Sequence, residues 1–315
     1  MKQRLITGAV IVTVLALMIV SKLLTPIIFD FGIGVLAVLG ATEVAKVFDR
    51  SGKYSNVMFA SIFPAVSYLI LCLGISKSWS WVGYAGWFVG SMGVYYLVIF
   101  AMNYIFLDKT KKEIANKKLE TTVLKYSLTK ALNTIVVCIY PTLLFATFIV
   151  INHINDLPMV ANNPVLLDAN LDFFLIVIIF AVQILTDSLA MVIGSALKGP
   201  KLCPVISPKK TISGAIGGVV GGLIGSMAVF GLFMLNDPFR SMYVALNLNV
   251  WYFLFFGFVG AIMCQFGDIF ASLLKRNARV KDYGTIFPGH GGVMDRLDGT
   301  VFVATFALIF LLLLA

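Results

Sequence analysis

Charged residues are scarce in this chain: they make up 12% of its 315 residues, while 60% of the residues are apolar. This balance excludes a soluble globular domain and is typical of a protein that crosses the bilayer several times. Histidine and cysteine are also rare. The chain has 2 His and 4 Cys, the cysteines are widely separated, and no CxxC pair occurs. Neither a zinc site nor a disulfide framework is therefore indicated.

Long apolar runs are the first positive signal. A transmembrane helix needs about 20 mainly apolar residues, and nine runs of roughly that length can be found in the sequence. They cover residues 5–21, 24–45, 55–76, 80–107, 132–152, 171–193, 213–235, 247–271 and 299–315. The sequence thus predicts an all-α, polytopic integral membrane protein with about nine transmembrane helices.

The distribution of Lys and Arg supports this number of spans. If the N-terminus is cytoplasmic, all but three of the 24 Lys and Arg residues fall on the cytoplasmic side, as the positive-inside rule requires. The exceptions are Lys22, Lys77 and Arg240. The net charge of +9 is then explained by orientation and by attraction to anionic lipid, so nucleic acid is not expected as a partner.

Polar content divides the chain into two parts. Residues 1–170 are predicted to form about five spans with a basic cytoplasmic loop at 108–130, either solvated or lying on the lipid headgroups as a helix. Residues 171–315 are predicted to form about four spans with cytoplasmic loops at 194–212 and 272–298 that are rich in Lys, Gly and Pro. We therefore expect the C-terminal part to carry the chemistry.

The seventh predicted span contains glycines four residues apart, in the run SGAIGGVVGGLIG from Ser213 to Gly225. Small residues at this spacing let helices approach closely in lipid. The run lacks the Gly-Lys-Ser/Thr that a phosphate-binding loop needs. Helix packing is the favoured interpretation, and the sequence leaves open whether the partner helix belongs to the same chain or to a second copy.

Besides Asp172, at the very start of its span, four acidic residues lie inside predicted spans: Asp30, Glu43, Asp187 and Asp268. Inserting an acid there costs about 2.5–3.5 kcal/mol, so each is a candidate functional residue. Glu43, Asp187 and Asp268 lie in the cytoplasmic halves of their helices, next to the polar loops. Asp30 lies near the outer end of its span, and we expect it to reach the external interface.

The loop at 272–298 places four Lys and Arg residues before a Gly-rich turn, with acids around it. Its residues closely resemble the signature of the CDP-diacylglycerol synthases, also called phosphatidate cytidylyltransferases: Ser272, Leu274-Lys275-Arg276, Lys281-Asp282, Gly284, Phe287-Pro288, His290-Gly291-Gly292 and Asp295-Arg296-Leu297-Asp298. The segment from Asp187 to Gly214 is also similar to this family. It departs from the family pattern at Ser213, where relatives usually have Glu, and at Lys198-Gly199, where the usual order is Gly-Lys.

The resemblance implies a membrane enzyme that transfers the cytidylyl group of CTP to phosphatidic acid, giving CDP-diacylglycerol and pyrophosphate for phospholipid synthesis. It implies Mg²⁺ as cofactor, with a second, monovalent cation left open. The implied partners are CTP, phosphatidic acid and membrane lipid, and a homodimer is left open. The implied location is a bacterial inner membrane, with the active site on the cytoplasmic side.

The resemblance also assigns roles to residues. Asp268 and Asp295 correspond to metal ligands of the family, and Asp298 closes the same motif as a ligand or as a partner of Arg296. Carboxylate oxygens are ligands that Mg²⁺ accepts, and Lys and Arg neutralise phosphates. The predicted catalytic residues are Asp268, Lys275, Arg276 and Asp295. The predicted substrate-binding residues are Asp187, Ser207, Lys209, Lys210, Lys281, Asp282, His290 and Arg296. For His290, positioning is favoured over proton transfer.

Two alternative functions remain. A CTP-dependent enzyme acting on another lipid phosphate or on a lipid alcohol would need similar loops. A cation-coupled transporter would use intramembrane acids such as Asp187 and Asp268. Against transport, these acids cluster near the cytoplasmic face and no inverted repeat is visible. A CDP-alcohol phosphotransferase is disfavoured because its Asp-Gly-x-x-Ala-Arg motif is missing.

Overall fold

The computed structural model describes residues 2–22, 25–51, 54–76, 81–117, 120–156, 170–245, 247–289 and 291–314. Within these residues, the long helices coincide with the nine predicted segments: α1 (Lys2–Ser21), α2 (Pro26–Arg50), α3 (Val57–Ser76), α4 (Trp81–Ile105), α6 (Val123–Asn152), α9 (Leu171–Leu197), α10 (Ile212–Phe233), α12 (Val250–Asn277) and α13 (Met294–Leu314). The prediction of an all-α membrane protein is confirmed in this coarse form.

Not all of these helices are equally suited to cross a membrane. Among the described residues, five are long and apolar enough, namely α2, α6, α9, α10 and α12. A sixth is counted if Val89–Ile105 and α5 (Leu107–Asn116) form one bent span, with 84° between them. The number nine therefore stays a prediction.

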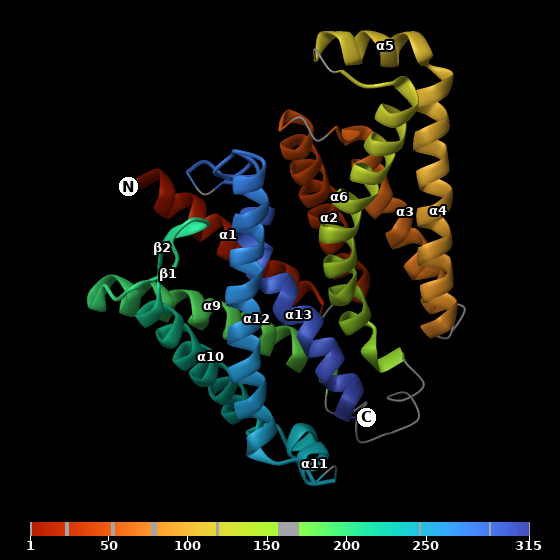
Figure 1. The fold of residues 1–315 in the computed structure, drawn as a ribbon. Helices are drawn as coiled ribbons and strands as arrows, with labels where there is room; N and C mark the ends of the chain where they lie inside the picture. Colours follow the sequence, from red (N-terminus) through yellow and green to blue (C-terminus); the bar gives the residue numbers. More distant parts are fainter. Residues whose placement is uncertain are drawn as a thin grey trace.

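The helices form two groups that meet at α13 (Figure 1). Helices α2, α3, α4 and α6 pack together, and α9 and α10 form a second group with α12. Helix α13 contacts α6 and α2 on one side and α9 and α12 on the other. The motif at the start of α13 consequently lies between the N-terminal and C-terminal parts of the chain.

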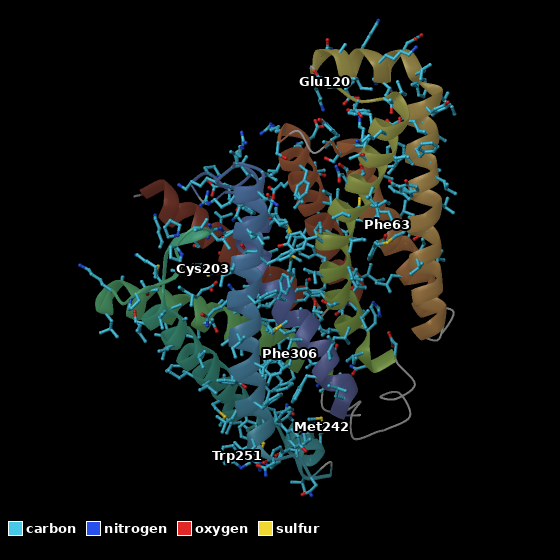
Figure 2. The ribbon with its side chains drawn as sticks, in the orientation of Figure 1. Phe63, Glu120, Cys203, Met242, Trp251 and Phe306 are labelled. Atoms are coloured by element: carbon cyan, nitrogen blue, oxygen red, sulfur yellow. The ribbon has the colours of Figure 1, made fainter. Side chains whose placement is uncertain are left out.

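Aromatic side chains fill contacts between neighbouring helices. Phe63 of α3 packs against Tyr95 of α4 with ring centroids 5.0 Å apart, and Phe306 of α13 packs against Phe256 of α12 at 5.4 Å (Figure 2). Burying large rings of this kind contributes dispersion and shape complementarity where the lipid itself supplies no hydrophobic driving force.

The glycine face of α10 packs inside the chain. Gly221 lies against the backbone of α9 at Leu185, and Gly222 lies against α12, where a Cβ would come 2.6 Å from the Gly257 carbonyl oxygen. Both glycines are buried. The partners of this face are thus helices of the same chain, which answers the question that the sequence left open.

The segments that are predicted to be cytoplasmic contain more regular structure than expected. Part of the 108–130 segment is helical, because α5 lies across the end of α4 and α6 begins at Val123 (Figure 1). Within the 194–212 loop, β1 (Lys201–Cys203) and β2 (Ser207–Thr211) form an antiparallel hairpin. The predicted 272–298 loop is shorter, since α12 continues to Asn277 and α13 begins at Met294. Two short elements complete the fold, η1 (Ile154–Asp156) and α11 (Asp237–Ala245).

Asp30, which is expected to reach the external interface, is buried in a polar network at the helix ends. It is only 2% exposed. Its carboxylate accepts a hydrogen bond from Asn152 Nδ2 at 2.8 Å and pairs with His153 Nε2 at 2.7 Å. Lys22 pairs with Asp172 and donates to Asn152 Oδ1 at 2.6 Å. The network compensates the burial of Asp30 and ties the ends of α1, α2, α6 and α9 together.

Candidate active site

Asp295 lies on the first turn of α13 and is held by three donors. Its Oδ1 pairs with Lys275 Nζ, at the end of α12, at 2.7 Å. Its Oδ2 accepts the backbone N–H groups of Tyr283 at 2.8 Å and Gly292 at 2.9 Å. Gly291 has φ +88°, and a Cβ there would lie 2.8 Å from Asp295 Oδ2. The Gly-rich turn is therefore wrapped closely around this carboxylate.

Asp268 of α12 forms the second ion pair of the site. Its Oδ2 lies 2.9 Å from Lys210 Nζ, which β2 supplies. The carboxyl groups of Asp268 and Asp298 lie within hydrogen-bonding reach of each other, and Asp298 is only 8% exposed. Lys210 thus places a positive charge directly beside this pair of acids.

Asp187 brings α9 to the same cluster. Its Oδ2 accepts a hydrogen bond from Gln183 Nε2 at 2.7 Å, and Cys264 Sγ of α12 lies 3.7 Å from its Oδ1. A Cβ on Gly299 of α13 would lie 2.8 Å from Cys264 Sγ. The small side chains at 264 and 299 thus allow α12 and α13 to approach closely beside the acids.

Arg276 connects the hairpin with the loop that follows α12. Its Nε donates to the Ile206 carbonyl at 3.2 Å and its Nη1 donates to the Val280 carbonyl at 3.1 Å. Arg276 is exposed. It therefore has access to solvent at the edge of the site while it holds the two loops together.

The two departures from the family pattern meet in space. Gly199 N–H donates to Ser213 Oγ at 3.3 Å, and Ser213 Oγ donates to Thr211 Oγ1 at 3.2 Å. Thr211 in turn accepts the Gly214 N–H at 3.1 Å and so caps α10. Ser213 and Gly199 thus help to close the base of the hairpin.

The structure brings together six of the predicted site residues: Asp187, Lys210, Asp268, Lys275, Asp295 and Asp298. The others lie on the segments that border this cluster. Ser207 and the exposed Lys209 lie on the hairpin, and the exposed Lys281 and Asp282 lie on the loop. Arg296 is exposed on the first turn of α13, and His290 lies outside the described residues.

Sequence reasoning missed several residues of the site. Gln183, Cys264 and the backbone of Tyr283 carry no motif of their own, and only their contacts reveal them. The Tyr283 hydroxyl donates to the Ala271 carbonyl at 3.2 Å, and burial raises the pKa of Tyr283 well above its usual value. Tyr283 therefore stays protonated and anchors the loop to α12.

The acids of the cluster are the side chains that could bind Mg²⁺, which prefers oxygen ligands. No group of three or more His, Cys, Asp or Glu side chains suited to a metal ion occurs among the described residues. Mg²⁺ is, however, commonly held by one or two carboxylates together with water and substrate phosphates. The adjacent carboxyl groups of Asp268 and Asp298 fit such a site, which substrate would complete. Asp295 instead directs both oxygens at donors of the protein.

The fold and the site define a polytopic membrane protein with paired acids and lysines at the ends of its helices. The chain belongs to the cytidylyltransferase family, whose model matches residues 2–314. The resemblance found in the sequence is thus confirmed.

Curated relatives agree with this family. The chain is 40% identical to the phosphatidate cytidylyltransferase of Rickettsia felis over 131 residues, which cover 42% of this chain and 56% of that protein. It is 37% identical to that of Rickettsia conorii over 128 residues (41% and 54%). It is 40% identical to that of Staphylococcus aureus strain COL over 126 residues (39% and 44%). The chain spans about half the length of the curated relatives it matches.

Proposed function

We propose that this protein transfers the cytidylyl group of CTP to phosphatidic acid, giving CDP-diacylglycerol and pyrophosphate. The observation that carries the proposal is the meeting of Lys210 and Lys275 with Asp268, Asp295 and Asp298 where α12, α13 and the hairpin come together. The family match and the names of the relatives support it further. Such a site can take a nucleotide from water and a lipid headgroup from the bilayer.

In the proposed reaction, a phosphate oxygen of the lipid attacks the α-phosphorus of CTP. A new P–O bond forms, the bond between the α- and β-phosphates breaks, and pyrophosphate leaves. The lipid phosphate is already ionised near pH 7, so the chain need not supply a strong base. Lys210 and Lys275 are each held in place by a carboxylate and would neutralise phosphate charge without large reorganisation.

The proposal includes a Mg²⁺ site at Asp268 and Asp298. When bound, Mg²⁺ would neutralise and orient the triphosphate. Asp295, which the family resemblance also makes a ligand, would have to release Lys275 or a backbone N–H to reach a metal. In the geometry described, it positions Lys275 and the Gly-rich turn.

The proposed topology has nine spans, a cytoplasmic N-terminus and a cytoplasmic active site in a bacterial inner membrane. The positive-inside pattern supports it. So does the arrangement of the ends: α5 and the loop between α12 and α13 lie at one end of the molecule, whereas α11 and the C-terminus lie at the opposite end (Figure 1).

The test uses detergent-solubilised protein with radiolabelled CTP, phosphatidic acid and Mg²⁺, following label into the organic phase. We expect Mg²⁺-dependent lipid label that falls by about 10²–10³-fold in Asp298→Asn, because a neutral amide oxygen is a weaker ligand for Mg²⁺ than a carboxylate. The matched control is Asp108→Asn, an exposed acid on α5, which should keep wild-type activity. Folded wild-type protein that labels no phosphatidic acid would reject the proposal, and label on another lipid phosphate would redirect it.

A further inference from the structure

Glu43 is a buried carboxylate that the proposed reaction does not use. It lies on α2 and is 4% exposed. Its Oε1 accepts the Val293 N–H at 3.0 Å, across 250 residues of chain, and its Oε2 accepts the Met294 N–H at 3.1 Å. These N–H groups are at the start of α13 and have no partner within that helix. Glu43 thus caps α13 from the other half of the chain.

The Gly-rich loop is shaped around the same carboxylate. A Cβ on Gly284 or on Gly292 would overlap the Glu43 carboxylate. One turn earlier on α2, a Cβ on Gly40 would lie 2.9 Å from Met294 Sδ. Glycine at 40, 284 and 292 therefore lets α2, the loop and α13 approach each other around Glu43.

Glu43 and Asp295 together accept hydrogen bonds from three consecutive backbone N–H groups. Asp295 accepts the Gly292 N–H at 2.9 Å, and Glu43 accepts those of Val293 and Met294. The direction of this first turn decides where the side chains of Asp295 and Asp298 point. A change at Glu43 would therefore be transmitted to both acids without any direct contact with substrate.

Burying a carboxylate is costly, and a hydrophobic side chain would fill the same space more cheaply. The cost is offset here by two backbone hydrogen bonds and by the positive end of the α13 dipole. The benefit that an apolar side chain cannot supply is a fixed direction for the turn.

We propose that Glu43 is a positioning residue of the active site, which caps α13 and thereby orients Asp295 and Asp298. The N-terminal half of the chain then shapes the site through the backbone of α13. The consequence for catalysis rests on the proposed function, whereas the cap itself does not.

The experiment compares Glu43→Gln, Glu43→Asp and a control, Glu113→Gln. Glu113 is another partly shielded acid, but it pairs with the side chain of Lys130 at 2.8 Å and lies on α5, away from the acid cluster. Three quantities are measured on the full-length protein in detergent: hydrogen exchange of peptides covering 291–297, thermal stability, and the Mg²⁺ dependence of cytidylyl transfer.

In Glu43→Gln we expect faster exchange in the 291–297 peptide, because the amide NH₂ faces a backbone N–H donor. We also expect kcat to fall about 10- to 100-fold and the half-saturating Mg²⁺ concentration to rise, with little change in KM for phosphatidic acid. Glu43→Asp keeps the charge and should recover part of the loss. Glu113→Gln should lower thermal stability only.

Unchanged exchange at 291–297 in Glu43→Gln would overturn the inference. An activity loss no larger than that of Glu113→Gln at equal loss of stability would also overturn it, because the effect would then be merely structural. If wild-type protein transfers no label, the proposed function fails, and the exchange experiment still decides separately whether Glu43 caps α13.

Discussion

At the scale of single residues, ion pairs between partly buried side chains hold the site together. The Lys275 side chain is 11% exposed and that of Asp295 3%. Such a pair is weak evidence for net stability, since both charges lose water, yet removing one partner leaves the other charge buried and unpaired. Lys275 therefore combines a structural role with its proposed contact to phosphate.

Replacing Lys275 by Met should destabilise the protein by about 3–5 kcal/mol, because Asp295 would keep only its backbone donors. Thermal unfolding in detergent measures this as a fall in Tm. The matched control is Lys125→Met, an exposed lysine at the start of α6, where no change is expected. Equal Tm values for the two variants would contradict the role assigned to Lys275.

His153 makes the opposite end of the molecule sensitive to pH. Its hydrogen bond to Asp30 raises the pKa of the imidazole above 6.5, burial opposes this, and Asp156, 2.8 Å from Nδ1, adds to the increase. The charges of Lys22 and Asp172 lie in the same network. Because the pKa is higher in the folded state, the stabilisation is complete below about pH 6.5 and is lost as pH rises through the raised value.

We therefore expect the Tm of the wild type to fall between neutral and alkaline pH, relative to His153→Gln, which does not titrate. At pH 6 the variant should be less stable by about 1–3 kcal/mol, since Asp30 loses a charged donor. Thermal unfolding of both proteins over this pH range measures the difference. A constant gap between the two curves would show that His153 does not titrate in this range.

At the scale of elements, contacts between helices depend on glycine where the backbones touch. Gly222 faces the Gly257 carbonyl and Ala261 Cβ of α12, whereas Gly231 on the same helix has nothing within 4 Å of its Cβ position. In lipid, this close approach is a main source of helix association, because lipid-facing apolar side chains gain nothing by leaving the lipid.

Gly222→Ala should consequently cost about 1–3 kcal/mol through overpacking, seen as a lower Tm. Activity should fall as well, because α12 carries Asp268 about two turns beyond Ala261. Gly231→Ala should leave Tm unchanged or raise it slightly, since alanine favours a helix over glycine by up to about 1 kcal/mol. Equal effects of the two substitutions would mean that α12 is not packed on this face of α10.

At the scale of the whole molecule, local sequence patterns predicted the helices and most of the site residues. They did not predict the contacts between residues that are distant in the sequence. Apolar runs located all the long helices, and the motif residues located most of the acids and lysines of the site, because both signals lie within short stretches of sequence. The 201–211 hairpin and α5 were not predicted in detail. Their polar sequences resemble solvated loops, and only the contacts of Arg276 and Glu113 show how they are held.

Contacts between residues far apart in the sequence could not be predicted from the spacing of motif residues. Glu43 was recognised as an intramembrane acid, but its pairing with the start of α13 spans 250 residues and has no local signal. The same holds for Asp30, whose burial against Asn152 and His153 has no local signal in the sequence. For an acid inside a span, the sequence thus predicts that a partner exists, while only the fold identifies it.

The orientation in the membrane gives the last prediction. Val205 in the hairpin and Asp237 at the start of α11 each have an exposed side chain, and α10 is the one helix between them in the sequence. If α10 crosses the membrane once, a cysteine at one position must face the cytoplasm and a cysteine at the other the outside.

Val205→Cys and Asp237→Cys are made separately in a chain with Cys72 and Cys203 replaced by alanine, since Cys138 and Cys264 are buried. A membrane-impermeant maleimide should label Asp237→Cys in intact spheroplasts and Val205→Cys only after lysis. The reverse result would invert the proposed topology, and labelling of both from one side would mean that α10 does not cross the bilayer.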